Sequence, residues 1–333
     1  MFVIGRIYEM KKENDARVYD FKIKEISKYE AAELVQTYHY SKVMPTLTKY
    51  FLGCFLEDEL VGVLTLGWGT QPRHTFNKLF PQEEILKKKE IIDDMNLVDL
   101  KSLDEFEHDI NDWYYEIGKM CMKPEMPRNS ESQMLSGVVK WMKENTNAKF
   151  LYTWADGIMG KPGYVYQAAN FLYGGFIWTQ IYISNKGEKI HPRSSKRLCL
   201  ENYDFKMERE PKFFEGKKID KKTGKARIYW LTQDFLDHKG ISKIYGKQFR
   251  YILPLNKKVR KLLKKSSVEW DLKYPKVNDL VWNKSTVEGK KQLSGMPYID
   301  SNMTEYNSKN VNAHKVKEIK EVKVTGNLEQ FFD

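Results

Sequence analysis

The sequence lacks the features of a secreted, membrane-spanning or disulfide-stabilised protein. It has three cysteines among 333 residues, Cys54, Cys121 and Cys199. Because they are far apart, odd in number and set in apolar surroundings, they indicate free thiols in a reducing compartment rather than a disulfide framework or a zinc site. No apolar run approaches the roughly 20 residues that span a bilayer, and the first five residues are too short for a signal-peptide core. We therefore expect a soluble intracellular protein.

Acidic residues are in deficit. The chain has 45 Asp and Glu against 56 Lys and Arg, which gives a net charge of +11 and an isoelectric point near 9.2. A basic surface fits a polyanionic partner, of which nucleic acid is the commonest. A lysine-rich proteome would give the same excess, so charge alone leaves both explanations open. The apolar fraction of 41% and the aromatic fraction of 14% are those of a globular protein.

Hydrophobic periodicity predicts strands that alternate with helices, and no internal repeat is visible. The expected strands are residues 19–26, 50–56, 60–68, 113–122, 149–156, 171–183, 226–231 and 248–255. The expected helices are residues 28–38, opened by a capping box at Ser27 and Glu30, 130–145, 164–171 and 256–265. Glycines on both sides of Trp68 predict a bulge or a close backbone approach there. This order predicts an α/β fold, a mixed sheet with helices on both faces.

The chain divides into a body and an extension. Residues 1–265 are expected to form one catalytic domain, within which residues 71–112 are an inserted or peripheral helical segment. Residues 208–225 are charged and predict a hairpin tip or loop. Residues 266–333 form a C-terminal extension in which Trp270, Tyr274 and Trp282 are candidates to dock on the body, with a loosely ordered tail after about residue 285.

Residues 113–171 have the layout of a site at the carboxyl edge of an α/β sheet. Ser130 is the predicted N-cap of the helix at 130–145, and first-turn amides with the positive end of the dipole favour an anion. Arg128 adds a charged fork, and Asn129 and Ser132 add short polar groups. The loop fits a phosphate or pyrophosphate site, or simply a well-capped helix. It has neither the G-x-G-x-x-G nor the Walker pattern.

Two further positions carry candidate acid–base groups. Asp156 ends an apolar strand beside Trp154, where partial desolvation would raise its pKa and suit a general base. A strand-end Asp that caps the next turn is the alternative. His39 and Tyr40 end a helix, where a histidine serves as a proton shuttle, a metal ligand or a partner of the helix dipole. The spacing of His39, His74 and Asp156 does not identify a metal site.

Basic residues crowd the expected helix at 256–265. They are Lys257, Lys258, Arg260, Lys261, Lys264 and Lys265. Arg250 and Tyr251 lie just before them, and aromatics beside cations suit a nucleic-acid backbone. A solvated lysine face is the alternative.

Five stretches, in order, resemble the Mom family of phage enzymes that modify adenine in DNA. They are residues 38–41 (YHYS), 62–64 (GVL), 126–132 (MPRNSES), 155–171 with its segment GYVYQAANF, and 249–252 (FRYI) with 255–257 (LNK). The combination of PRNSES with YQAANF is far more specific than any single short motif. The resemblance covers most of residues 30–265 and excludes residues 71–111 and the tail.

The resemblance implies an acyltransferase fold of the GNAT type, with a mostly antiparallel sheet. It implies conversion of the adenine N6 amine in duplex DNA to a carbamoylmethyl derivative, which shields phage DNA from host restriction enzymes. The family's catalytic positions fall on His39, Tyr40, Lys119 and Asp156, and its acyl-coenzyme A positions fall on Ser132 and Tyr166. Lys119 stands where the family has arginine, so charge is retained without the bidentate fork. The usual glycine-containing GNAT loop is replaced by residues 128–132.

These inferences give a working hypothesis for the site. Asp156 or His39 would accept an N6 proton, and Lys119 would steady negative charge on the donor. The donor site would comprise Arg128, Asn129, Ser130, Ser132 and Tyr166. DNA contacts would comprise Arg250, Lys257, Lys258, Arg260 and Lys261. Stacking partners for an extruded adenine would be Tyr40, Trp68, Trp154 and Tyr166.

The cofactor and the cellular setting follow from the same hypothesis. The donor is acetyl-coenzyme A or another acyl-coenzyme A, or an aminoacyl donor such as glycyl-tRNA. An iron requirement, with His39 and Asp156 as weak ligand candidates, and a homodimer are left open. The expected setting is the host cytoplasm, with double-stranded DNA as partner and no membrane. Two alternatives are a GNAT enzyme acting on a protein or small-molecule amine, and a non-catalytic DNA-binding protein.

Overall fold

A computed structural model of the chain describes residues 18–69, 72–79, 113–190, 196–216, 231–286 and 289–294. Within these ranges the centre is one ten-stranded sheet with the strand order β1-β2-β3-β4-β5-β8-β6-β7, extended by β9 beside β8 and by β10 beside β9. The strands are β1 (Phe21–Glu25), β2 (Thr48–Leu56), β3 (Glu59–Gly67), β4 (Tyr114–Met122), β5 (Phe150–Asp156), β6 (Leu172–Ile183), β7 (Lys189–Ile190), β8 (Ser242–Pro254), β9 (Val281–Thr286) and β10 (Gly289–Ser294). The helices are α2 (Lys28–Tyr38), α3 (Pro72–Leu79), α7 (Ser130–Asn145), α8 (Tyr164–Ala168), α9 (Lys196–Arg209), α10 (Gln233–Lys239) and α11 (Lys257–Leu262).

The strand directions confirm the predicted fold class, a mixed and mostly antiparallel sheet in an α/β protein. In the described part of the chain, β4 and β5 form the one parallel pair. They pair only over their first residues, Tyr114–Glu116 against Phe150–Tyr152. Beyond that point the strands are no longer hydrogen-bonded to each other, so the sheet is open between their carboxyl ends.

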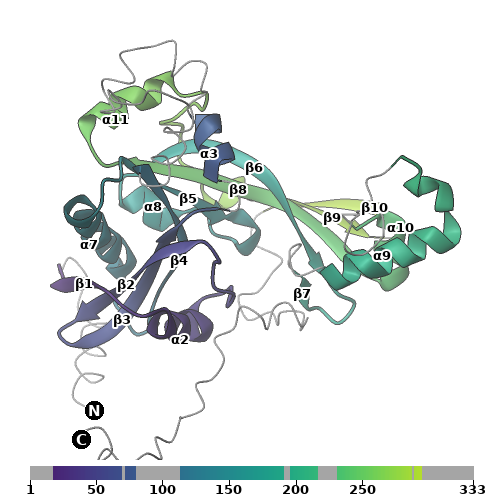
Figure 1. Ribbon diagram of the computed structural model, residues 1–333, viewed down its shortest axis with the longest axis horizontal. Coiled ribbons are helices and arrows are strands. Elements are labelled where there is room, and N and C mark those ends of the chain that lie inside the picture. Colours follow the sequence, from purple (N-terminus) through teal and green to yellow (C-terminus); the bar gives the residue numbers. More distant parts are fainter. Residues whose placement is uncertain are drawn as a thin grey trace, which may run out of the picture.

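Helices cover both faces of the body (Figure 1). On one face, α2 packs Val35 against Val63 of β3 and Cys121 of β4. On the other face, α7 packs Leu135 against Leu64 in a larger cluster. Neighbouring residues of β3 therefore point to opposite sides of the sheet, as the period of a strand requires. Full burial of one such aliphatic side chain contributes about 1.5–3 kcal/mol.

Local sequence signals explain how these elements begin and meet. The Ser27 hydroxyl accepts a hydrogen bond from the Glu30 amide, and the Glu30 carboxylate accepts one from the Ser27 amide, which confirms the predicted capping box. At the second predicted feature, a Cβ on Gly67 would lie 1.9 Å from the Leu47 carbonyl oxygen. The Trp68 amide donates to that same oxygen at 2.8 Å. The close backbone approach predicted around Trp68 is therefore confirmed.

Three aromatic side chains that follow α11 pack on the body. Trp270 packs against the core cluster that contains Phe150 and Ile252. The Tyr274 hydroxyl donates to the Phe171 carbonyl at 2.6 Å, and Trp282 is 1% exposed. These aromatic contacts fix the chain after α11 against β5, β6 and β8.

Several predicted boundaries differ from the structure. Strand β8 begins at Ser242, six residues before the predicted start at residue 248, and β10 forms within the predicted loose tail. Helices α9 and α10 had no predicted counterpart, and α9 includes residues 208–209 of the predicted loop. In the predicted peripheral insert, α3 buries Phe76 and Leu79 in the core. Residues 80–112, most of the predicted strand at 226–231 and residues 295–333 lie outside the described ranges.

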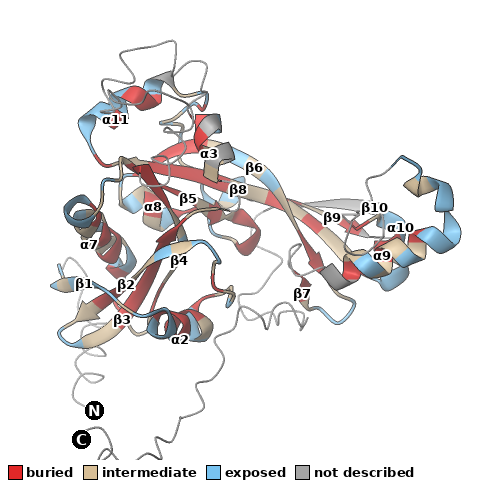
Figure 2. Ribbon diagram, viewed as in Figure 1, coloured by how far each residue is buried: buried red, intermediate tan, exposed pale blue. Residues whose placement is uncertain are grey.

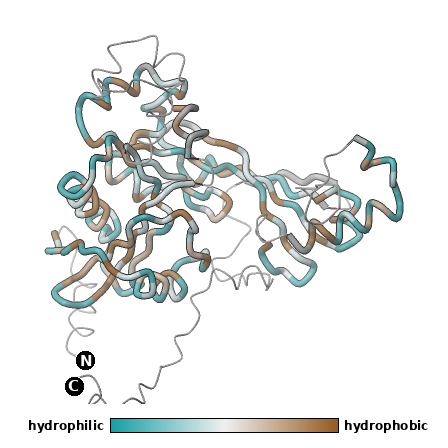
Figure 3. Tube along the Cα trace, viewed as in Figure 1, coloured by the Kyte–Doolittle hydropathy of each residue, from teal (hydrophilic) through white to brown (hydrophobic). Residues whose placement is uncertain are grey.

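An outer lobe extends from the body along the long strands β6 and β8 (Figure 1). It consists of α9, α10, β7 and the distal ends of β6 and β8. Its own core includes Tyr182, Ile190, Leu198 and Phe235. Apolar segments follow the strands and the inward sides of the helices, while the outer side of the lobe is largely hydrophilic (Figure 3). The lobe is thus a separately packed extension of the same sheet.

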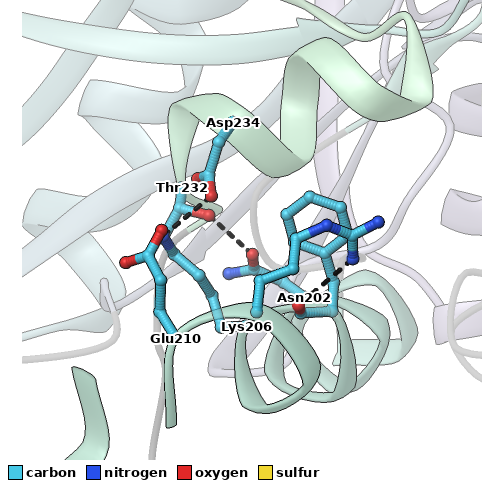
Figure 4. Close-up of polar contacts among 7 residues, drawn as sticks. Asn202, Lys206, Glu210, Thr232 and Asp234 are labelled. Carbon is cyan, nitrogen blue, oxygen red and sulfur yellow. Dashed lines mark hydrogen bonds and ion pairs between the residues drawn. The ribbon is translucent and has the colours of Figure 1, made fainter. Parts of the chain in front are cut away.

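A buried lysine joins the two helices of the outer lobe (Figure 4). The Lys206 ammonium lies 2.7 Å from the Asp234 carboxylate and 3.0 Å from that of Glu210. Beside it, the Thr232 hydroxyl donates to the Asn202 amide oxygen at 2.7 Å. Burial alone would raise the pKa of Asp234, but hydrogen bonds from Lys206 and Thr232 hold it below its ordinary value. Asp234 is therefore ionised at neutral pH and ties α10 to α9.

We expect Asp234→Asn to lower the free energy of unfolding by about 1–2 kcal/mol at pH 7, because a charge-assisted hydrogen bond to the buried Lys206 is lost. The depressed pKa means that this stabilisation is present above the carboxyl's unfolded pKa and disappears as pH falls through the folded value. Urea denaturation at neutral and acidic pH measures both effects. Glu208→Gln is the matched control, since Glu208 is exposed and makes only a long ion pair of 3.8 Å with Arg209. Equal destabilisation by both variants would contradict the role of Asp234.

Candidate active site

The candidate site lies where β4 and β5 separate. Asp156 is the last residue of β5, and Lys119 is in the half of β4 that has no β5 partner. The C-terminal end of α2 brings His39 and Tyr40 to the same place. Their proximity is evident from the charge of Lys119, which acts on His39, and from that of Asp156, which acts on Tyr40. The structure therefore brings together all four predicted catalytic residues from three separate elements. Their catalytic roles stay predictions.

His39 is held in a defined orientation at the end of α2. Its Nδ1 lies 2.9 Å from both the amide nitrogen and the carbonyl oxygen of Ser41. Its ring stacks on Tyr40 with centroids 4.3 Å apart. Tyr40 in turn packs against a cluster that includes Ile158 and Met159, which directly follow Asp156 in the chain. The two aromatic rings thus form one wall of the site, leaving Nε2 of His39 as the ring nitrogen not engaged by Ser41.

Electrostatics keep both aromatic groups in one protonation state. Burial lowers the pKa of His39 to about 3, with help from the nearby charges of Lys119, Lys189 and Lys161 and against the hydrogen bond to Ser41. His39 is therefore neutral at physiological pH. Burial also raises the pKa of Tyr40, and the neighbouring Asp156 reinforces the shift. Tyr40 consequently retains its hydroxyl proton and can donate a hydrogen bond.

Asp156 is the acidic group of the cluster. Its Oδ1 accepts a hydrogen bond from the Ile158 amide at 3.1 Å, which starts the short 3-10 helix η1 (Gly157–Met159). Burial raises the pKa of this carboxyl, while Lys189, the η1 amides and Lys119 oppose the shift. A carboxylate with a raised pKa and cationic neighbours is suited to accept a proton. Asp156 caps the next turn, as one interpretation of its sequence position expected, and its role as a general base stays a prediction.

Lys189 is a member of the cluster that the sequence did not reveal. It is in β7, opposite Ile183 of β6, and its side chain is only 8% exposed. Its charge acts on both His39 and Asp156. In the sequence it follows Gly187-Glu188, so it resembles an ordinary hairpin lysine. Only the path of β6 and β7 brings it beside residues 39 and 156.

Lys119 owes its position to an irregularity in the sheet. The register between β3 and β4 shifts between Thr65 and Leu66, and the Lys119 amide donates to the Thr65 hydroxyl oxygen at 2.9 Å. Side chains alternate along a strand, so residues 116 and 119 would ordinarily point to opposite faces. The register shift lets both point to the α2 face of the sheet. Cys121, two residues further, packs under α2 on that face.

The loop at 128–132 departs from its prediction in one respect. The N-cap of α7 is Asn129, not Ser130; it has a left-handed φ of 70° and makes no side-chain cap hydrogen bond. Ser130 is the first helical residue, fully buried, and its hydroxyl has no hydrogen-bond partner in the described part of the chain. The Ser132 hydroxyl donates back to the Asn129 carbonyl at 2.8 Å. Arg128 is exposed beside these groups, so the loop keeps the composition of an anion site with a different cap.

Other predicted contact residues divide into surface and interior. Tyr166 is 8% exposed and packs against Phe171 and Tyr251, so its role in holding a donor stays a prediction. Arg250 is buried, donates to the Gly174 carbonyl at 3.3 Å and lies over the Trp154 ring. Its predicted contact with DNA phosphates does not fit this interior position. Trp154 is covered by that guanidinium, and Trp68 donates its indole N–H to the Tyr114 carbonyl.

The predicted basic helix forms as α11. The Asn256 side chain caps it by accepting from the Val259 amide at 2.9 Å. Val259 and Leu262 are buried on its inner side. The exposed residues on the outer side are Lys257, Lys258, Arg260 and Lys261. The helix therefore presents four cations to solvent, as a phosphate-binding surface requires.

His39 and Asp156 stay the candidate metal ligands at the site, and an iron requirement stays a prediction. Within residues 18–294, excluding the undescribed gaps, no three His, Cys, Asp or Glu side chains are grouped as ligands. His39 and Asp156 are instead accompanied by the cations Lys119 and Lys189.

None of the helices described is both long and apolar enough to cross a membrane.

Comparison with known proteins places the chain in a family. Residues 20–276 match the model of the Mom protein family. The chain is also 25% identical, over 245 residues, to the methylcarbamoylase mom of Escherichia phage Mu; the match covers 73% of this chain and 79% of that protein. The range matched by the family model includes all four clustered positions, His39, Tyr40, Lys119 and Asp156. The chain belongs to the Mom protein family.

Proposed function

We propose that the protein is a DNA-modification enzyme that converts the N6 amine of adenine in duplex DNA to N6-carbamoylmethyladenine and so protects phage DNA from restriction. The observation that carries this proposal is the convergence of His39, Tyr40, Lys119 and Asp156 in a chain of the Mom family. The similarity to a phage methylcarbamoylase supports the reaction class. The enzyme would act inside the host cell, where phage DNA is exposed to restriction.

Asp156 is the residue best suited to act as the general base. As the bond between N6 and the donor carbon forms and the bond between the donor group and its carrier breaks, N6 must lose a proton, and the Asp156 carboxylate accepts it. The pKa of His39 is about 3, so its imidazole is a poor proton acceptor at neutral pH. His39 and the protonated Tyr40 instead supply hydrogen bonds that orient the reacting groups. Of the two bases that the sequence allowed, the electrostatics favour Asp156.

The two lysines supply positive charge at the reacting centre. Lys119 and the buried Lys189 both influence Asp156. A preorganised cation in a desolvated site stabilises negative charge that develops on the donor during transfer. Two ammonium groups offset the loss of the bidentate arginine fork at position 119, because the stabilising charge no longer depends on a single side chain.

The substrate must present N6 outside the base stack, since the atom is paired and stacked in duplex DNA. The exposed cations of α11, Lys257, Lys258, Arg260 and Lys261, would hold the phosphate backbone. Tyr40 is the aromatic candidate that lies within the cluster and could contact the extruded adenine.

The loop at 128–132 is the proposed donor site. Arg128, the first-turn amides of α7 and the buried hydroxyl of Ser130 form a group of donors that suits an anionic carrier. The product bears a CH2 on N6 and a terminal amide, which transfer of an acetyl group alone does not produce. An aminoacyl donor such as glycyl-tRNA already contains the required carbon and nitrogen atoms, but it must rearrange, because simple transfer would join its carbonyl carbon to N6. An acyl-coenzyme A instead needs a separate nitrogen source and an oxidant.

The function is tested by expressing the full chain in a restriction-deficient host and analysing nucleosides from its DNA by mass spectrometry. We expect a modified adenosine that is absent from cells carrying the empty vector. The purified DNA should also resist restriction enzymes whose sites contain adenine. DNA binding without a modified base would contradict the enzymatic proposal and favour a non-catalytic DNA-binding protein.

The same nucleoside digests can identify the donor. Cells are fed isotopically labelled glycine or labelled acetate in separate cultures during expression. Label from glycine in both the carbon and the nitrogen of the modification supports an aminoacyl donor. Label from acetate in carbon only supports an acyl-coenzyme A donor.

A further inference from the structure

Exposed aromatic rings occupy the middle of β6. Phe176 and Trp178 are 42% and 50% exposed, and their rings meet edge to face with centroids 5.9 Å apart. Figure 2 shows this exposed stretch between the buried ends of the strand. Large apolar side chains so exposed, and adjacent on one strand face, indicate an interaction surface rather than core packing.

Lysines from β8 lie directly beside these rings. The register places Trp178 opposite Lys247, and residues opposite each other in antiparallel strands point to the same face. The Lys247 ammonium lies 4.5 Å from the centroid of the Phe176 ring, and that of Lys243 lies 4.6 Å from the Tyr245 ring. We call these five residues, Phe176, Trp178, Lys243, Tyr245 and Lys247, the aromatic–lysine strip.

A third pair of the same kind continues the strip. Tyr164 of α8 is 49% exposed, and the Lys276 ammonium lies 5.4 Å from its ring centroid. The short 3-10 helix η5 (Val277–Asp279) connects this pair to the strip, because Lys247 donates to the Asp279 carbonyl and the Val277 amide donates to the Tyr164 hydroxyl. The combined surface presents several ring faces and three ammonium groups.

The strip is not part of the catalytic cluster. Gln248 pairs with Asp156 across β5 and β8, so these two side chains share one face of the sheet. Lys247, the next residue, points to the opposite face because side chains alternate along a strand. The proposed reaction therefore leaves the strip unused, although it begins one residue from the partner of Asp156.

We propose that the aromatic–lysine strip binds an unpaired DNA strand, with bases stacked on Phe176 and Trp178 and phosphates next to Lys243, Lys247 and Lys276. Aromatic rings beside a cationic track are the usual means of binding single-stranded nucleic acid, because every base has a ring face and every linkage has a charge. The net charge of +11 favours the same partner. The choice of DNA rests on the proposed function, in which extrusion of adenine disrupts base pairing next to the site.

The test is fluorescence anisotropy with a labelled single-stranded DNA oligonucleotide and the full chain. We expect the double variant Phe176→Ala/Trp178→Ala to weaken binding by about tenfold or more, since each stacked base contributes substantially. Trp178→Phe retains a ring, so it should keep most of the affinity that the single-site variant Trp178→Ala loses. Tyr29→Ala is the matched control, because Tyr29 is 56% exposed on α2 and outside the strip. An abasic oligonucleotide should bind the wild type and the double variant equally.

The lysines give a second readout. For single-stranded DNA the slope of log affinity against log salt changes by about 0.7 per phosphate contact, so replacing all three lysines with glutamine should reduce the slope by about 2. Unchanged affinity in the double variant would overturn the proposal, as would an equal loss on fully paired duplex DNA. Tighter binding of the matching RNA would assign the strip to RNA instead and so overturn the choice of DNA.

These outcomes can be separated from failure of the proposed function. Asp156→Asn should bind single-stranded DNA as the wild type does, because it leaves the strip intact. If no modified adenine forms in cells but the strip variants lose single-stranded DNA binding, the proposed reaction is wrong and the strip stands. If modification occurs at the wild-type level and binding to single-stranded DNA is unchanged in the double variant, the reaction stands and the strip is wrong.

Discussion

Asp156→Asn is expected to reduce modified adenine at least about 100-fold, because general base catalysis typically contributes that much or more and an amide cannot accept the N6 proton. The asparagine oxygen can still accept the hydrogen bond from the Ile158 amide, so the η1 turn should persist. Nucleoside mass spectrometry of DNA from expressing cells provides the measurement. Asp58→Asn is the control, since Asp58 is exposed in the β2–β3 turn. Modification at the parental level in Asp156→Asn would exclude an essential base at this position.

Measurements of unfolding stability and of the pH dependence of activity distinguish loss of the base in Asp156→Asn from misfolding of the variant. Burial raises the pKa of Asp156 in the folded protein, so its ionisation disfavours the fold. This destabilisation is absent below the carboxyl's ordinary pKa and grows as pH rises through the folded value. Asp156→Asn should therefore be at least as stable as the wild type at neutral pH. In the wild type, activity should rise with pH through the raised pKa, because only the carboxylate accepts a proton.

Gly157→Ala is expected to lower the free energy of unfolding by about 2–4 kcal/mol and to reduce modification at the same time. A Cβ at this position would lie 2.3 Å from the Lys247 carbonyl oxygen and 2.8 Å from the Phe249 ring. The first is backbone of β8 and the second is a buried side chain, so neither can yield without displacing the end of β5. Because Asp156 immediately precedes Gly157, this displacement would also move the proposed base.

The matched control for this variant is Gly137→Ala in α7. A Cβ there would lie 2.9 Å from the side chain of Ile23, which can rotate, and alanine favours a helix by up to about 1 kcal/mol over glycine. Urea denaturation of both variants compares the two sites. Equal unfolding midpoints for Gly157→Ala and the wild type would show that β8 can withdraw from this turn at little cost.

The local elements that carry the site were accessible from the sequence. Ser27 and Glu30 predicted the start of α2, and the apolar run to Asp156 predicted β5 with an acid at its end. These signals are short-range, because a cap or an alternating pattern depends on residues a few positions apart. The family resemblance added the roles, which no local pattern of His39 or Lys119 could supply.

The sequence by itself determined the fold class, the capped helix α2, the strand-end carboxylate and the membership of His39, Tyr40, Lys119 and Asp156 in one family pattern. Only the tertiary structure decided which polar groups are buried together. It brought Lys189 of β7 into the cluster, withdrew Arg250 into the core, moved the cap of α7 from Ser130 to Asn129 and formed the outer lobe on β6 and β8. The reason is that burial and pKa depend on neighbours across the sheet, and strand pairing brings together residues that are far apart in the chain.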